Sequence, residues 1–174
     1  KISYYNADDP VEAYVKVSTQ TQDFTFTKTA SDANGDTYTA TYQANPDLNS
    51  KVRFQVFQAT NPQYSSTWCR VNATKQANGK YTFTSCKSGN AGANFVLAED
   101  GTFQIAGLPI GTYYIWEYAT ADDYLLNNTI TNTNGQSVKG NLFTVNVTAS
   151  NSSITGTNTQ KTTTYNFTKL FRND

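Results

Sequence analysis

Three polar residues stand in predicted β-strands at positions where an apolar side chain is expected. Lys28 ends the alternating face of FTFTK, Glu117 ends the face of GTYYIWEY that carries a tyrosine and an isoleucine, and Asn166 lies near the middle of YNFTKLF. Side chains alternate between the faces of a strand, so Lys28 and Glu117 are expected to point inward with their apolar neighbours. The alternatives are that Lys28 extends from a strand end into solvent and that Glu117 faces water at its strand end. Burial disfavours charged forms, which turns a lysine toward a nucleophilic amine and a glutamate toward a neutral acid. The pattern therefore indicates nucleophilic and acid–base chemistry inside a sheet.

The strands that must position these residues follow from composition and periodicity. The chain has 174 residues and is rich in Thr, Asn, Tyr, Phe and Val, a bias that favours strands and turns. About nine or ten short strands alternate with turn signals, and no helix start-and-stop pattern is present. We therefore expect an all-β sandwich over residues 24–174. Residues 1–23 are interpreted as an N-terminal extension, a linker or an added edge strand.

Charge and residue usage argue against several functional classes. Thirteen basic residues balance thirteen acidic ones, so no field favours nucleic acid or an anionic membrane. No apolar run is long enough for insertion into a membrane. The chain has no histidine, which removes the commonest general base and metal ligand. Neither a cofactor nor a metal is expected; the oxygen-rich stretch Asp32–Asp36 is interpreted as a solvated turn because it lacks the closing ligand of a calcium loop.

The two cysteines lie in a predicted hairpin. The segment TWCRVNATKQANGKYTFTSCKS has two strand-like halves around QANG, and a four-residue loop at 76–79 places Lys75 opposite Lys80. The same register places Cys69 opposite Cys86, at a spacing that suits a disulfide. We expect this bond to form and to brace an inserted hairpin, which implies an oxidising compartment. Two separate buried thiols are the alternative.

One block of sequence resembles a known family. EDGTFQIAGLPIGTYYIWEYATADDYLL is similar to the Cna protein B-type domain of Gram-positive pilins and surface adhesins, although ATADDY lacks the usual Pro and Gly of its loop. FTFTK resembles the first strand of that family, KVRFQVFQA the second conserved strand and YNFTKL the last. The resemblance implies an inverse immunoglobulin-like sandwich across residues 24–174.

The resemblance also implies a use for the three polar residues. Domains of this family form an intramolecular isopeptide bond between a Lys and an Asn, assisted by a buried acid. By this analogy Lys28 and Asn166 are joined, and Glu117 is the acid that polarises the asparagine carbonyl and moves protons. The match at the last strand is looser than the others, so Asn146 and Asn173 remain alternatives to Asn166.

By the same resemblance, the chain is expected to be a structural domain of a pilin or wall-anchored surface protein. Its bond would form once, so it would not be an enzyme with turnover. Its partners would be other pilin subunits or surface-protein domains, joined by sortase, and its location would be extracellular, on the cell wall or pilus. Two alternatives stay open: an adhesin that binds a host glycan or matrix protein through insertions at 36–50 and 60–94, and a carbohydrate-binding accessory module.

Overall fold

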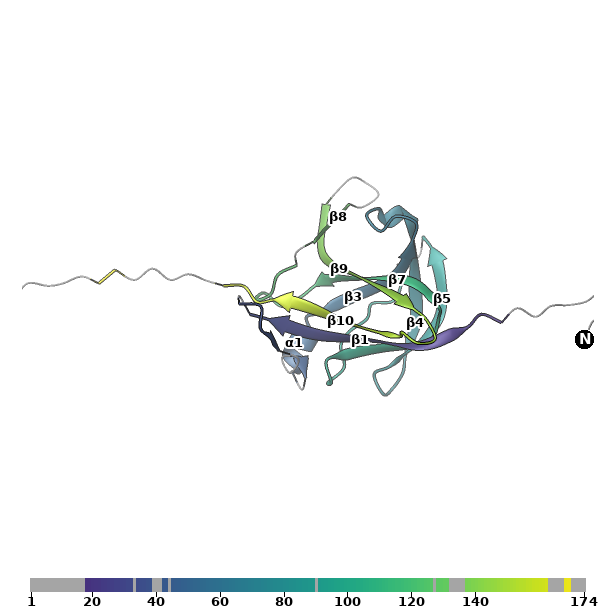
Figure 1. Ribbon diagram of the computed structural model, residues 1–174, viewed down its shortest axis with the longest axis horizontal. Coiled ribbons are helices and arrows are strands. Elements are labelled where there is room, and N and C mark those ends of the chain that lie inside the picture. Colours follow the sequence, from purple (N-terminus) through teal and green to yellow (C-terminus); the bar gives the residue numbers. More distant parts are fainter. Residues whose placement is uncertain are drawn as a thin grey trace, which may run out of the picture.

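The structure is a computed structural model that describes residues 18–32, 34–38, 42–43, 45–89, 91–126, 128–131, 137–162 and 168–169. Strands dominate these residues. They are β1 (Thr21–Ser31), β2 (Thr37–Tyr38), β3 (Arg53–Ala59), β4 (Trp68–Lys75), β5 (Tyr81–Ser88), β6 (Thr102–Pro109), β7 (Gly111–Ala119), β8 (Asn128–Thr131), β9 (Ser137–Val147) and β10 (Ser153–Thr159). The expectation of an all-β fold is confirmed (Figure 1).

Short helical turns interrupt the strands in the described part of the chain, where none was expected. They are α1 (Pro46–Asn49) and the 3₁₀ turn η2 (Ser65–Thr67). α1 falls in the segment NPDLNS, in which the sequence showed no helix start-and-stop pattern. The Asn45 side chain accepts a hydrogen bond from the Leu48 amide at 3.2 Å, and Pro46 occupies the first helical position. These are normal helix-start signals, but a single turn is too short for periodicity to reveal.

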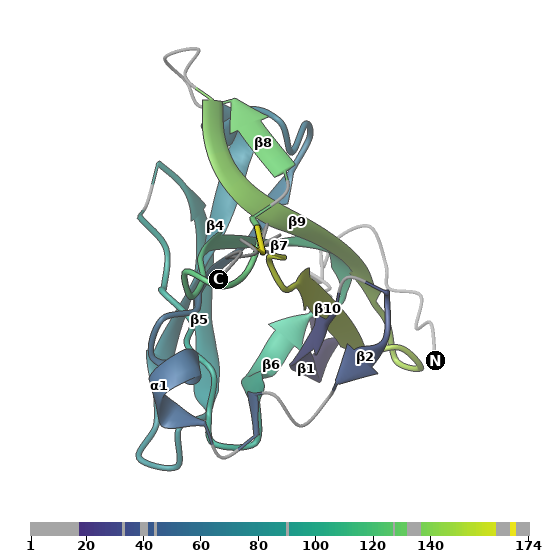
Figure 2. The ribbon, with the colours of Figure 1, turned by 90° about the vertical axis from the view of Figure 1, so that its left-hand side faces the viewer.

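The strands form a sandwich-like sheet that curls around one core. Their hydrogen-bonded order is β10-β1-β6-β5-β4-β3-β7-β9-β8, with β2 paired to the end of β1. β5 connects the two layers, because it pairs with β4 along its length and with β6 only at Tyr81 and Thr82. Figure 2 shows β1, β6 and β10 on one side of the molecule, with β9 curving across above them. The first and last described strands, β1 and β10, are parallel neighbours.

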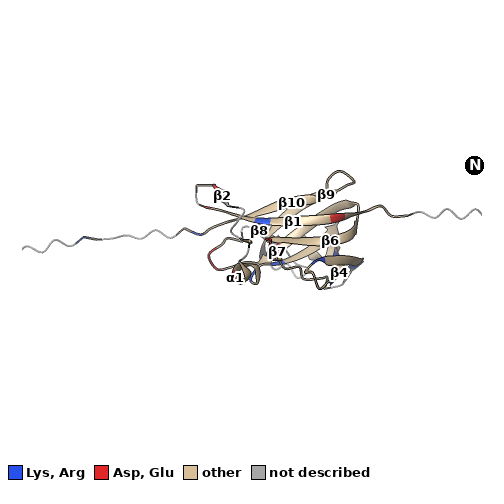
Figure 3. Ribbon diagram, turned by 90° about the horizontal axis from the view of Figure 1, so that it is seen from below, with Lys and Arg blue, Asp and Glu red and all other residues tan. Residues whose placement is uncertain are grey.

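The interior is largely aromatic and aliphatic. Buried side chains from both layers form the main cluster, including Phe24, Phe26, Phe54, Phe103 and Ile115. Phe26 stacks on Phe103 with ring centroids 5.0 Å apart. Such packing excludes water and makes any polar group in the same layer depend on protein partners. Figure 3 shows how few charged residues the strands carry in this view.

The hairpin β4–β5 carries the expected disulfide between Cys69 and Cys86, with Cα atoms 5.5 Å apart. The predicted register was wrong, because Cys86 lies opposite Val71 and Cys69 lies opposite Ser88. Two one-residue offsets produce this difference. Lys75 pairs with Tyr81 in place of Lys80, and a register shift between Asn72 and Ala73 adds the second offset, as a β-bulge does. The cysteines are therefore diagonal neighbours, which disulfide geometry still allows.

The two ends of the domain are only partly described. Most of the predicted N-terminal extension at 1–23 falls outside the described residues, and so does most of the predicted last strand YNFTKLF at 165–171. The predicted domain boundary at residue 24 stays a prediction; β1 begins three residues earlier, at Thr21. Among the described residues, no helix is long or apolar enough to cross a membrane.

Candidate functional site

Lys28 lies on the inner face of β1, where the sequence placed it. Its side chain is only 1% exposed, and its register neighbour on β10 is Gly156. The ammonium nitrogen Nζ lies 5.2 Å from the centre of the Phe143 ring. Lysine is almost never fully buried without a partner, so the positions of its neighbours decide what this group can do.

The nearest partner of Lys28 is Glu117, on the inner face of β7. Its carboxylate is fully buried, and Oε2 accepts a hydrogen bond from Lys28 Nζ at 2.6 Å. Glu117 follows Tyr113 and Ile115 along the same face, and all three are buried. The inward direction predicted for Lys28 and Glu117 is therefore confirmed.

The third member of the cluster is Asn158, on β10. Lys28 Nζ donates to its carbonyl oxygen Oδ1 at 2.6 Å, and its own Nδ2 donates to Glu117 Oε1 at 2.5 Å. Nδ2 also donates to Thr120 Oγ1 at 3.0 Å, and Asn141 Nδ2 donates to Oδ1 at 2.7 Å. The side chain of Asn158 is fully buried, and all four of its hydrogen-bonding positions are occupied. These bonds fix the orientation of the amide.

The electrostatics of the cluster favour a reactive amine. Burial lowers the pKa of Lys28, and the nearby Glu117 carboxylate only partly opposes that effect. Desolvation disfavours the ammonium, and transfer of its proton to Glu117 would leave two neutral groups in the core. Tyr42 is buried near the cluster, where burial, and secondarily the charge of Glu117, raises the pKa of its phenol.

The described residues point to a different asparagine from the one that the sequence favoured. Asn166 and Asn173 lie outside the described residues. Asn146 is exposed on β9, opposite Thr112. Asn158 was missed because SITGTNT has a glycine and an asparagine at two of its three inward positions and looks like a turn. Its position in the chain could have identified Asn158. It lies in the last threonine-rich segment before Lys161, and a strand so late in the chain can pair with the first strand.

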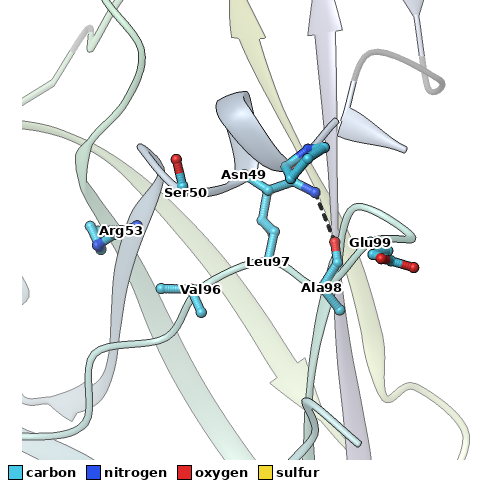
Figure 4. A pocket seen from close by; sticks show the side chains of 8 residues that line it. Asn49, Ser50, Arg53, Val96, Leu97, Ala98 and Glu99 are labelled. Carbon is cyan, nitrogen blue, oxygen red and sulfur yellow. Dashed lines mark hydrogen bonds between the residues drawn. The ribbon is translucent and has the colours of Figure 1, made fainter. Parts of the chain in front are cut away.

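The described part of the surface carries no cluster comparable to that of Lys28, Glu117 and Asn158. A pocket of about 330 Å³ lies between α1 and residues 96–99, and the Asn49 amide donates to the Ala98 carbonyl at its wall (Figure 4). Neither Lys28 nor Glu117 lines it. In the described part of the chain, no group of three His, Cys, Asp or Glu is placed to hold a metal ion. Of the two tryptophans, Trp68 is 1% exposed and stacks on Phe57, so it cannot serve as an exposed sugar platform.

Comparison with known proteins supports the fold. The family model described as the SpaA prealbumin-like fold domain matches residues 22–139, which is more than half of the chain. No curated protein matches the chain. The matched residues include Lys28 and Glu117, whereas Asn158 lies beyond them.

Solved structures of pilins have a similar fold. A minor pilin of the Gram-positive pathogen Streptococcus agalactiae superposes with a TM-score of 0.51 at 14% identity, covering 87% of this chain and 49% of that one. The shaft pilin SpaA of Lactobacillus rhamnosus GG gives a TM-score of 0.47 at 16% identity, covering 84% and 48%. A group B streptococcus pilus 2b backbone protein gives 0.45 at 18% identity, covering 90% and 46%. The chain spans about half the length of these pilins.

Proposed function

The chain belongs to the SpaA prealbumin-like fold domain family, and from that premise we propose that it is a structural domain of a pilin or wall-anchored surface protein, closed by a self-formed Lys28–Asn158 isopeptide bond. One observation carries this proposal. The amine of Lys28 lies 2.6 Å from both Glu117 Oε2 and Asn158 Oδ1 inside the buried core. A lysine, an acid and a carboxamide held so closely have the reactants of amide exchange already oriented.

The reaction balances within the cluster. The Lys28 ammonium passes one proton to Glu117 Oε2, and the resulting amine attacks Cγ of Asn158. As the tetrahedral intermediate collapses, Glu117 delivers a proton to Nδ2 and receives the second surplus proton from Nζ. The Cγ–Nδ2 bond breaks, ammonia leaves, and Glu117 ends protonated. One amide has replaced another, and a buried ion pair has become two neutral groups, which relieves its desolvation cost.

The departing nitrogen has a route to solvent. Asn158 Nδ2 donates to Thr120, and Thr120 also lines a surface pocket of about 260 Å³. The oxygen side of the amide faces Lys28 and Asn141. Loss of ammonia through this pocket would make the step irreversible under ordinary conditions, so the domain reacts once and does not turn over.

The position of the bond suits a load-bearing role. β1 and β10 are parallel neighbours, so tension applied at Thr21 and Thr159 would shear them past each other. Figure 1 shows the two strands lying side by side. A covalent bond between Lys28 and Asn158 would carry that load between the strands in place of their hydrogen bonds. This role places the domain outside the cell, on the wall or pilus, with other subunits and sortase as its assembly partners.

Intact mass of the reduced protein tests the proposal. The wild type should be lighter than its sequence mass by one ammonia, and Lys28→Ala and Asn158→Ala should each have the full mass. Glu117→Ala should also keep the full mass, since no group would then transfer the protons. A full-mass wild type would refute the isopeptide bond, and the family membership would then stand without it.

A further inference from the structure

Glu117 is not placed to stabilise the negative charge that the proposed reaction builds on Asn158 Oδ1. The sequence suggested that Glu117 would polarise the asparagine carbonyl, yet both of its oxygens are engaged elsewhere. Oε2 accepts from Lys28, and Oε1 accepts from Asn158 Nδ2, on the nitrogen side of the amide. Nucleophilic attack by Lys28 puts negative charge on Oδ1, and such charge needs a donor placed in advance.

Asn141 supplies a donor at that position. It lies on β9, directly opposite Glu117 on β7, and its side chain is only 6% exposed. Its Nδ2 donates to Asn158 Oδ1 at 2.7 Å, and it also lies 3.4 Å from the Leu125 carbonyl. An amide keeps its N–H protons across the whole range of working pH, so this donor is always present.

We infer that Asn141 is a catalytic residue of isopeptide formation, the oxyanion donor that holds the charge developing on Asn158 Oδ1. The two roles then fall to neighbouring strands. Glu117 on β7 transfers protons at the amide nitrogen, and Asn141 on β9 stabilises the negative charge on the amide oxygen. The contact made to Oδ1 before the reaction strengthens as charge builds, which selectively stabilises the transition state. This inference rests on the proposed isopeptide bond.

The test measures the rate of ammonia loss in the full chain. Protein with photocaged lysine at position 28 is unfolded in denaturant, uncaged by light and refolded by dilution, and samples are quenched for intact mass. Asn141→Leu keeps a similar volume and removes the donor, so ammonia loss should slow by about 100-fold, the effect of deleting one oxyanion-hole donor. The control is Asn146→Leu on the same strand; Asn146 is exposed, and that variant should react at the wild-type rate.

A second variant separates chemistry from folding. In Asn141→Asp the introduced carboxyl can donate a hydrogen bond only when it is protonated. The ratio of its rate to that of Asn141→Leu should therefore rise as the pH falls, which a purely structural role would not produce. Tryptophan fluorescence shows whether Asn141→Leu refolds. If it does not, the rate of Asn141→Asp is compared with that of Asn141→Ala instead.

The outcomes distinguish this inference from the function beneath it. If the uncaged wild type never loses ammonia, the isopeptide proposal fails and this role falls with it. If the wild type loses ammonia and folded Asn141→Leu or Asn141→Ala does so within about threefold of the same rate, only the role of Asn141 is refuted. A pH-independent rate ratio would refute it as well.

Discussion

Removal of the proposed cross-link by Asn158→Ala should cost the domain a large part of its stability. Lys28 and Asn158 are 130 positions apart, and tethering a loop of that length restricts the unfolded chain by about 5 kcal/mol at 25 °C. The substitution also deprives the buried Lys28–Glu117 pair of its amide partner, which adds about 1–3 kcal/mol. The expected loss in free energy of unfolding is therefore about 6–8 kcal/mol.

Guanidinium unfolding followed by tryptophan fluorescence can measure this loss. Trp68 is buried against Phe57, so its emission should change when the sheet opens. The loop contribution alone should lower the melting temperature by about 10–20 °C in a chain of this size. The denaturant slope should rise in Asn158→Ala, because an untethered chain exposes more surface on unfolding. Lost hydrogen bonds by themselves would leave that slope unchanged.

The control for this experiment is Asn146→Ala, an exposed asparagine on β9 that should change the free energy of unfolding by less than about 0.5 kcal/mol. The reasoning is refuted if Asn158→Ala loses no more than about 3 kcal/mol with an unchanged slope, because hydrogen bonds alone would then explain the loss.

Three further changes have defined outcomes. Reducing the Cys69–Cys86 disulfide, which spans 17 positions, should cost about 3 kcal/mol in thermal unfolding and leave the mass deficit of one ammonia intact. Gly156→Ala should destabilise by about 1–3 kcal/mol and slow ammonia loss, because its Cβ would lie 2.4 Å from Cζ of the buried Phe26 ring; a wild-type melting temperature would contradict this. Burial raises the pKa of Tyr113 from 10.0 to about 12, so the unfolded chain ionises first and stability is lost as the pH rises from 10 to 12. Tyr113→Phe should lose less stability across that window, and an identical alkaline profile would exclude Tyr113 as a contributor.

Period-two alternation was enough to predict half of the site. Lys28 and Glu117 each end a strongly apolar face, so their inward direction could be derived from sequence, and the structure confirms it. The disulfide could also be predicted, although its register could not, because the one-residue offsets at the turn and between Asn72 and Ala73 leave no clear composition signal.

Asn158 and Asn141 could not be predicted from the sequence, because their inward positions depend on tertiary packing. β10 carries Gly156 at an inward position because the Phe26 ring occupies that space. A glycine where an apolar side chain is expected hides the alternating pattern of the strand. Asn141 lies in NTNGQSVKGN, which has the composition of a turn, yet β9 begins at Ser137 and pairs there with β8. Polar residues at inward positions make their own strands look like loops.

A tryptic map of the reduced protein tests the central claim most directly. Trypsin should not cut at a cross-linked Lys28, so the account predicts a branched peptide that joins residues 17–51 to residues 140–161, one ammonia lighter than their sum. Fragmentation should place the branch at Asn158. A branch to residues 162–169, which contain Asn166, would contradict the assignment of the bond, and unbranched peptides cut after Lys28 would contradict the bond itself.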